Sequence, residues 1–204
     1  MILSQARHIL IFSIIAVVTA FAVTIYSCGS VFAEHLIEKD TPSLSVDYSN
    51  VNLSETKTKA DAYFELAQRT DSNTKRAKYL QKSASEYYIL VSASPDDIDA
   101  CIRLARVYDM QSRDNYAKSY FYHALGLNAK SPEANYYLGD FYYKRKKYIK
   151  ALEYYDKAFR YGISPDAEKY KQLGMVYEHL GDSVRATNYY KRAANFKPIN
   201  IQGE

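Results

Sequence analysis

The sequence predicts an all-α fold made of repeated units, and two observations support this prediction. Its 204 residues include only 7 Gly and 5 Pro, too few turn residues for an all-β fold of many short strands. The second observation is a repeated phrase. LARVY, LGDFY and LGMVY begin at Leu104, Leu138 and Leu173, at spacings of 34 and 35 residues. A fixed period of this length is typical of repeat proteins.

The first 33 residues predict a membrane-directed leader, which we expect to be an N-terminal apolar helix. Residues 9–26 form an uncharged apolar run that is just long enough for a membrane-spanning helix. Arg7 precedes this run and acidic residues follow it, so the N-terminus is expected in the cytoplasm and the rest outside. Three fates stay open: a signal peptide cleaved after Ala33, a retained transmembrane signal anchor, or lipidation at Cys28. Each predicts a bacterial cell-envelope protein, anchored in the membrane or exported.

Two segments separate the leader from the regular repeats. Residues 34–56 are rich in Ser, Thr, Asn and Asp and lack a helical period, so they predict a flexible polar linker. Residues 57–97 predict a degenerate helical hairpin. Its first half contains a Leu66-Ala67 pair like the one that opens the repeats, and its second half has apolar residues at steps of three and four.

Small and aromatic residues recur at fixed positions in the three regular units. Thirteen residues after each repeat leucine stands an alanine, four later an aromatic and three later a second alanine: Ala117, Phe121 and Ala124; Ala151, Tyr155 and Ala158; Ala186, Tyr190 and Ala193. Residues 105, 139 and 174 are Ala or Gly. We expect the small residues to let paired helices approach closely and the aromatic residues to fill the space between successive units, as part of the core.

This pattern resembles the tetratricopeptide repeat (TPR) family, in which L-G-x2-Y is followed by A-x3-F and a closing proline. The resemblance frames TPR 1 at 98–131, TPR 2 at 132–165 and TPR 3 at 167–200. It implies a right-handed superhelical solenoid of antiparallel helix-turn-helix repeats. Ala105 departs from the usual glycine, and the consensus Trp is absent throughout.

The resemblance also implies that the first helix of each unit lines a concave groove that binds a peptide or a partner helix. An ordinary solvated helix face is the open alternative. The positions carried over are Asp99, Ile102, Arg106, Asp109, Glu133, Tyr136, Asp140, Tyr143, Glu168, Lys171, Met175 and Glu178. The carboxylate clamp of co-chaperone members needs Lys, Asn and Arg where this chain has Ile102, Arg106 and Tyr137, so we reject that function.

A basic turn provides an alternative function. Lys144, Arg145, Lys146 and Lys147 lie between the expected helices of TPR 2, where they suit docking on an anionic membrane or polymer. The simpler interpretation is a helix C-terminus whose cations complement the helix dipole. Residues 57–204 carry more basic than acidic side chains, which gives that region a formal charge of +7.

Composition argues against several other functions. The formal charge of +4 is too mild to indicate nucleic-acid binding without a clustered basic face. Two Cys and four scattered His lack metal-ligand spacing, and no nucleophile is paired with a base. We therefore predict a non-enzymatic interaction scaffold without cofactor or metal, whose partner is another protein. The outer face of the last hairpin leaves self-association open.

Overall fold

The computed structural model describes residue 48 and residues 50–196. The leader expected at 1–33, most of the linker expected at 34–56 and the last residues of TPR 3 lie outside the described residues. Asp47–Glu204 form one compact unit, and the buried apolar cluster of the described residues lies wholly within it. Since this unit contains its own core, we expect residues 47–204 to fold as an independent protein.

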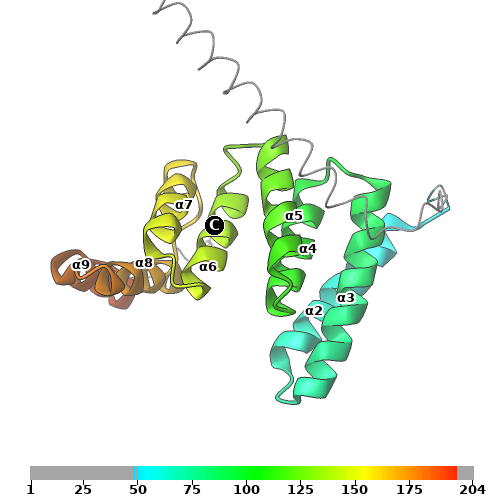
Figure 1. Cartoon of the computed structure of the whole chain (residues 1–204), viewed down its shortest axis with the longest axis horizontal. Helices are drawn as coiled ribbons and strands as arrows, with labels where there is room; N and C mark the ends of the chain where they lie inside the picture. Colours follow the sequence, from blue (N-terminus) through cyan, green and yellow to red (C-terminus); the bar gives the residue numbers. More distant parts are fainter. Residues whose placement is uncertain (1–47, 49, 197–204) are drawn as a thin grey trace, which may run out of the picture. The chain divides into compact units, whose positions relative to one another are not determined.

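The described residues form eight helices and no strand, which confirms the all-α prediction for this part of the chain. The helices pair in chain order as four antiparallel hairpins (Figure 1). Their bounds are α2 Leu53–Arg69, α3 Asn73–Ala93, α4 Ile98–Met110, α5 Asp114–Leu127, α6 Pro132–Lys144, α7 Tyr148–Arg160, α8 Ala167–His179 and α9 Ser183–Ala194. None of these helices is both long and apolar enough to cross a bilayer.

Side-chain caps explain where most of the helices begin. Before six of the eight described helices, a polar side chain accepts a hydrogen bond from the backbone N–H three residues on, which satisfies one of the free donors of the first turn. The capping residues are Asn52, Ser72, Asp97, Ser131, Asp166 and Asp182. The cap at Asn52 starts α2 at Leu53, so the last four residues of the expected linker are helical.

The same turn joins the two helices of each regular hairpin. Ser112, Lys146 and Gly181 occupy equivalent positions and have φ values of 59°, 57° and 79°. In each case the next residue donates its N–H to the carbonyl of the repeat tyrosine, Tyr108, Tyr142 or Tyr177, at 2.9–3.0 Å. This geometry closes a helix C-terminus through one left-handed residue. The three turns therefore present equivalent residues at the same edge of the stack.

Glycine allows the paired helices to approach closely, as the sequence predicts. A Cβ added at Gly139 would lie 2.7 Å from Cδ1 of Tyr155, and one at Gly174 would lie 2.6 Å from Cε1 of Tyr190. Both distances are below normal contact, so an aromatic ring on the second helix occupies the volume that a side chain on the first would need.

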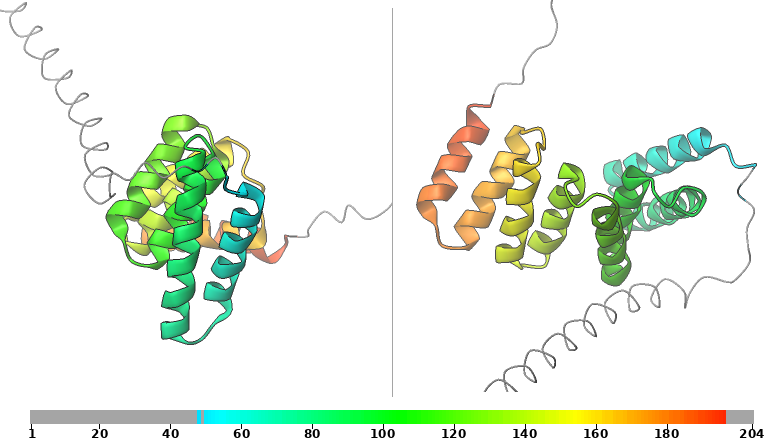
Figure 2. Two further views of the ribbon diagram at one scale, coloured as in Figure 1. Left: turned by 90° about the vertical axis from the view of Figure 1, so that its right-hand side faces the viewer. Right: turned by 90° about the horizontal axis from the view of Figure 1, so that it is seen from above.

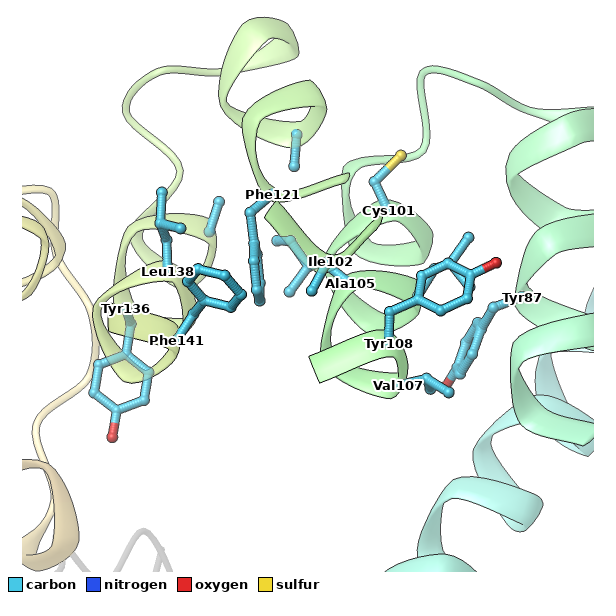
Figure 3. Close-up of a cluster of buried hydrophobic side chains, with 14 of the residues drawn as sticks. Tyr87, Cys101, Ile102, Ala105, Val107, Tyr108, Phe121, Tyr136, Leu138 and Phe141 are labelled. Atoms are coloured by element: carbon cyan, nitrogen blue, oxygen red, sulfur yellow. The ribbon is translucent and has the colours of Figure 1, made fainter. Parts of the chain in front are cut away.

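Aromatic rings also connect successive hairpins. Phe121 of α5 meets Phe141 of α6 edge to face, with ring centroids 6.0 Å apart (Figure 3). Tyr87 of α3 and Tyr108 of α4 belong to the same buried cluster (Figure 3). Leu66 of α2 is exposed although the equivalent Leu104 is buried, because no described hairpin precedes α2. The stack therefore holds the first helices α2, α4 and α6 in fixed register.

Candidate protein-binding groove

The first helices of three successive hairpins enclose a pocket of about 250 Å³. Its walls combine aromatic rings with side chains of both charges. The lining residues are Phe64 and Gln68 from α2, Arg106, Asp109 and Met110 from α4, Phe121 from α5, and Tyr137, Asp140 and Lys144 from α6. Of the four helices that line the pocket, α2, α4 and α6 are the first helices of their hairpins, and only α5 is a second helix. The pocket therefore lies on the face that the sequence predicts as the groove.

Arg106 is held between two aromatic rings in this pocket. Its guanidinium carbon lies 4.0 Å from the ring centroid of Tyr137 and 4.9 Å from that of Phe64. Both distances are within the range of cation–π attraction. The ion pairs of the described residues involve Arg103 and Arg145 but not Arg106. Arg106 therefore provides a positioned cation whose hydrogen-bond donors are not used by a carboxylate.

Asp140 lies in the same pocket in an unfavourable environment for its charge. The hydroxyl of Tyr155 donates to Oδ1 of Asp140 at 2.5 Å. Burial raises the pKa of Asp140 to about 6, although this hydrogen bond and the nearby cations Lys144 and Arg106 act in the opposite direction. The carboxylate is already used inside its own hairpin, since Tyr155 belongs to α7.

Asp109 links α4 to α6 at the rim of the pocket. Its side chain is only 6% exposed and pairs with Nζ of Lys144 at 2.6 Å and Nη1 of Arg145 at 2.8 Å. Arg145 also pairs with Asp114 and packs over the ring of Phe141, 3.5 Å from its centroid. These contacts fix one hairpin against the next, so the rim is preorganised.

A second polar network joins α2 to α4. Arg103 pairs with Asp61 at 2.8 Å and with Asp99 at 3.0 Å, and Lys57 pairs with Asp99 at 2.8 Å. The hydroxyl of Tyr87 donates to Asp61 in the same network. The expected groove residue Asp99 is therefore engaged in holding two hairpins together.

The structure brings three of the expected groove residues into the pocket and places two in the core. Arg106, Asp109 and Asp140 line the pocket. Ile102 is 4% exposed and Tyr136 is 6% exposed, so the expectation that they face an open groove is wrong. Ile102 belongs to the buried apolar cluster.

The buried position of Tyr136 has a structural reason. Its ring packs against Tyr155, with centroids 5.4 Å apart, and its hydroxyl donates to Gln172 of α8. Tyr136 therefore packs in the contact between the α6–α7 hairpin and the α8–α9 hairpin, not in an open groove.

The remaining expected residues lie away from the pocket. Tyr143 packs beside Tyr148 and His179, and Met175 is half-buried. Lys171 is exposed 3.8 Å from Glu168, Glu133 is exposed, and Glu178 accepts a hydrogen bond from Tyr190. The pocket is therefore formed by the first three hairpins, and the fourth does not contribute to it.

Phe64, Gln68 and Tyr137 are pocket residues that sequence reasoning did not assign to the groove. A signal for the first two was present. When Leu66-Ala67 is aligned with Leu104-Ala105, Phe64 and Gln68 take the positions of Ile102 and Arg106. Carrying the groove positions back into the degenerate hairpin would have identified both.

Among the described residues, two of the four cations of the basic turn, residues 144–147, form ion pairs and two do not. Lys144 is the last residue of α6, and both it and Arg145 pair with acidic residues of the preceding hairpin. Lys146 and Lys147 are exposed. Half of the expected basic surface is therefore neutralised within the protein.

The residues with catalytic or metal-binding chemistry are not clustered in the part of the chain that is described. No group of three or more His, Cys, Asp and Glu residues there has a metal-binding arrangement. Burial raises the pKa of the Cys101 thiol to about 12, which keeps it protonated and poorly nucleophilic. That the chain is not an enzyme stays a prediction.

Comparison with known proteins supports the TPR resemblance. Residues 132–161 match the tetratricopeptide repeat family model. A crystal structure of MamA aligns with a TM-score of 0.51 and 21% identity, covering 74% of this chain and 95% of that one. PilF of Pseudomonas aeruginosa aligns with a TM-score of 0.55 and 18% identity, covering 68% of this chain and 61% of that one. No curated protein sequence matches. At these identities the structural likeness establishes a TPR-type fold alone.

Proposed function

We propose that this protein is a non-enzymatic interaction scaffold that binds an extended peptide or a partner helix along the face formed by α2, α4 and α6. The position of Arg106 carries the proposal. Its guanidinium is held between the Phe64 and Tyr137 rings within the pocket, while the neighbouring Asp109 is paired with Lys144 and Arg145. A fixed guanidinium loses less conformational entropy when it binds a carboxylate than a free one does.

The pocket indicates the chemistry of the partner. A volume of about 250 Å³ is smaller than typical small-molecule sites, which begin at about 300 Å³, and suits a single side chain. Phe64, Met110 and Phe121 provide apolar walls beside the cation of Arg106. The partner segment therefore combines an acidic residue, which pairs with Arg106, and a bulky apolar residue, which fills the pocket.

Peptide selection tests this function and does not require an identified partner. A displayed library is selected on residues 47–204, and the affinities of the enriched peptides are measured by titration. Arg106→Gln should weaken them by about tenfold to a hundredfold, the value of a hydrogen bond to a charged group. Arg113→Gln is the matched control, because Arg113, like Arg106, packs over two aromatic rings, those of Tyr108 and Tyr116.

Two outcomes would contradict the proposed groove. Equal losses in the two arginine variants would mean that general charge controls the affinity. Unchanged affinity in Arg106→Gln would mean that the selected peptides bind elsewhere.

The cellular location is part of the same proposal. We propose that the leader directs the chain to the bacterial cell envelope and leaves the repeats outside the cytoplasm, on the evidence of the uncharged run at residues 9–26. Intact mass and N-terminal sequencing of the mature protein distinguish the three fates. Met1, Cys28 or Glu34 as the first residue would indicate an anchor, a lipoprotein or a cleaved signal, respectively. An unprocessed chain in the cytosolic fraction would contradict this location.

The alternative function, docking through the basic turn, needs a different surface from the one the sequence suggests. Since Lys144 and Arg145 pair with Asp109 and Asp114, residues 144–147 alone offer only two exposed cations that form no ion pair among the described residues, Lys146 and Lys147. A docking surface on this side of the stack must therefore include residues outside the segment 144–147.

A further inference from the structure

The turns α6–α7 and α8–α9 meet at one edge of the stack (Figure 2). The Tyr148 ring, at the start of α7, stacks on the ring of His179, at the end of α8, with centroids 4.3 Å apart and planes 10° apart. Tyr143 packs against both rings. The two turns thus form one continuous surface. We call residues 146–150 and 180–185 the turn edge.

Aliphatic side chains project from the turn edge into solvent. Ile149 is 76% exposed and Val184 is 80% exposed, the highest values among the large hydrophobic residues of the described chain. Each is the second residue of its helix, so they occupy equivalent positions in adjacent hairpins. Leu180, 37% exposed, lies between them along the chain. These side chains contribute little to the core, so their apolar surface is free to be buried against a partner.

Cations surround these aliphatic residues. Lys146, Lys147 and Lys150 are exposed, and none of them forms an ion pair among the described residues, where Lys150 instead lies 5.5 Å from the ring centroid of Tyr142. Arg185 pairs with Asp182.

The acidic residues nearby do not cancel this charge. Asp109 and Asp114 are held by Lys144 and Arg145, and Glu178, which accepts a hydrogen bond from the neutral hydroxyl of Tyr190, brings one negative charge against the three lysines. The turn edge therefore has a net excess of positive charge beside exposed aliphatic side chains.

We propose that the turn edge docks on an anionic lipid bilayer, with Ile149 and Val184 entering the headgroup region and Lys146, Lys147 and Lys150 contacting lipid phosphates. Lysines close to an anionic membrane are attracted to it, and aliphatic side chains beside them gain by burial in the interface. Tyrosine, here Tyr148, is favoured at the same depth. Charge complementarity and the projecting aliphatic residues together favour a bilayer. This surface is separate from the groove, so the inference does not depend on the proposed peptide binding.

Vesicle binding tests the proposal on residues 47–204, which exclude the leader. The protein is titrated with vesicles of phosphatidylcholine alone and with vesicles containing phosphatidylglycerol, at low and high salt. We expect binding only to the anionic vesicles, and we expect it to weaken as salt rises. Binding of equal strength to both kinds of vesicle, or no binding to the anionic ones, would overturn the proposal.

Two variants separate the contributions of charge and of aliphatic insertion. The triple variant Lys146→Asn, Lys147→Gln, Lys150→Gln should bind about a hundredfold more weakly, since each lysine contributes about fivefold near such a surface. Asparagine is chosen at 146 because it tolerates the left-handed backbone there. The double variant Ile149→Ser, Val184→Ser should bind about tenfold more weakly.

Leu127→Ser is the matched control, because Leu127 is also exposed but ends α5 at the end away from the turns. It should leave vesicle binding within twofold of the unmodified protein. An equal loss in this control would overturn the proposal, as would unchanged binding by the double variant. A polyglutamate peptide tests the alternative that the turn edge binds an acidic protein. If it binds the turn edge as strongly as the vesicles do, and the double variant does not weaken it, the surface is a site for acidic proteins instead.

Discussion

Replacing Gly139 by alanine tests whether close packing of paired helices holds the repeats together. The new Cβ would lie 2.7 Å from Cδ1 and 2.8 Å from Cε1 of Tyr155. That ring is 1% exposed, and its hydroxyl is bound to Asp140, so it has no free volume to enter. Overpacking of this kind costs about 1–3 kcal/mol, while alanine in place of glycine gains up to about 1 kcal/mol in a helix. We expect a net loss of about 1–2 kcal/mol in the free energy of unfolding.

Gly174 offers a matched substitution with a different expected result. A Cβ there would lie 2.6 Å from Cε1 of Tyr190, but this ring is half-buried and belongs to the last described helix. It can turn toward solvent, so Gly174→Ala should change the free energy of unfolding by less than about 0.5 kcal/mol. Urea denaturation of residues 47–204, followed by far-UV circular dichroism, measures both. Equal effects at the two glycines, or stabilisation by Gly139→Ala, would refute the reasoning.

Two further substitutions test the electrostatics of the pocket. The raised pKa of Asp140, about 6 against an ordinary 3.8, means that the folded protein keeps this proton to higher pH than the unfolded chain. The stability this provides is fully present below about pH 4 and is lost as pH rises through 6. Asp140→Asn, which keeps an acceptor for Tyr155, should therefore gain about 2–3 kcal/mol at pH 7 and almost nothing at pH 3 in urea titrations. The same gain at both pH values would contradict this. Asp109→Asn should lower the free energy of unfolding by about 2 kcal/mol, because Lys144 and Arg145 lose their shared carboxylate. A double-mutant cycle with Arg145→Gln measures the coupling energy. A coupling energy near zero would mean that the Asp109–Arg145 pair does not join the hairpins.

The repeat architecture could be predicted from the sequence because the same steric requirement recurs at each unit. Gly139 and Gly174 let the paired helices approach, as the sequence predicts, but the rings of Tyr155 and Tyr190 lie against these glycines within one hairpin, whereas we expected them between successive units. The groove was predicted only in part. Ile102 has the register of a groove residue but is buried, because an apolar side chain gains more by joining the core than by lining a solvated face.

Charge pairing between hairpins explains why the basic turn has fewer unpaired cations than its sequence suggests. Asp109 and Lys144 are 35 residues apart, one residue more than the 34-residue spacing of Leu104 and Leu138, so they lie in neighbouring units and meet when the units stack. Between α2 and α4 the spacing of the equivalent Leu66 and Leu104 is 38 residues, because α3 is longer than the other second helices, and the pair that joins them, Asp61–Arg103, is 42 residues apart. Considering the turn by itself could not reveal these partners.

Site-specific photocrosslinking tests the central claim, that the face of α2, α4 and α6 binds a protein partner. A photoreactive amino acid is placed at Gln68, which is exposed and lines the pocket, and separately at Tyr122, which is exposed on α5 and does not line it. Crosslinking is done in living cells on the full chain. The account predicts a crosslinked partner at Gln68 that is absent at Tyr122 and is lost from the Gln68 probe when Arg106→Gln is added. A partner captured equally at both positions, or one at Gln68 that Arg106→Gln leaves unchanged, would contradict it.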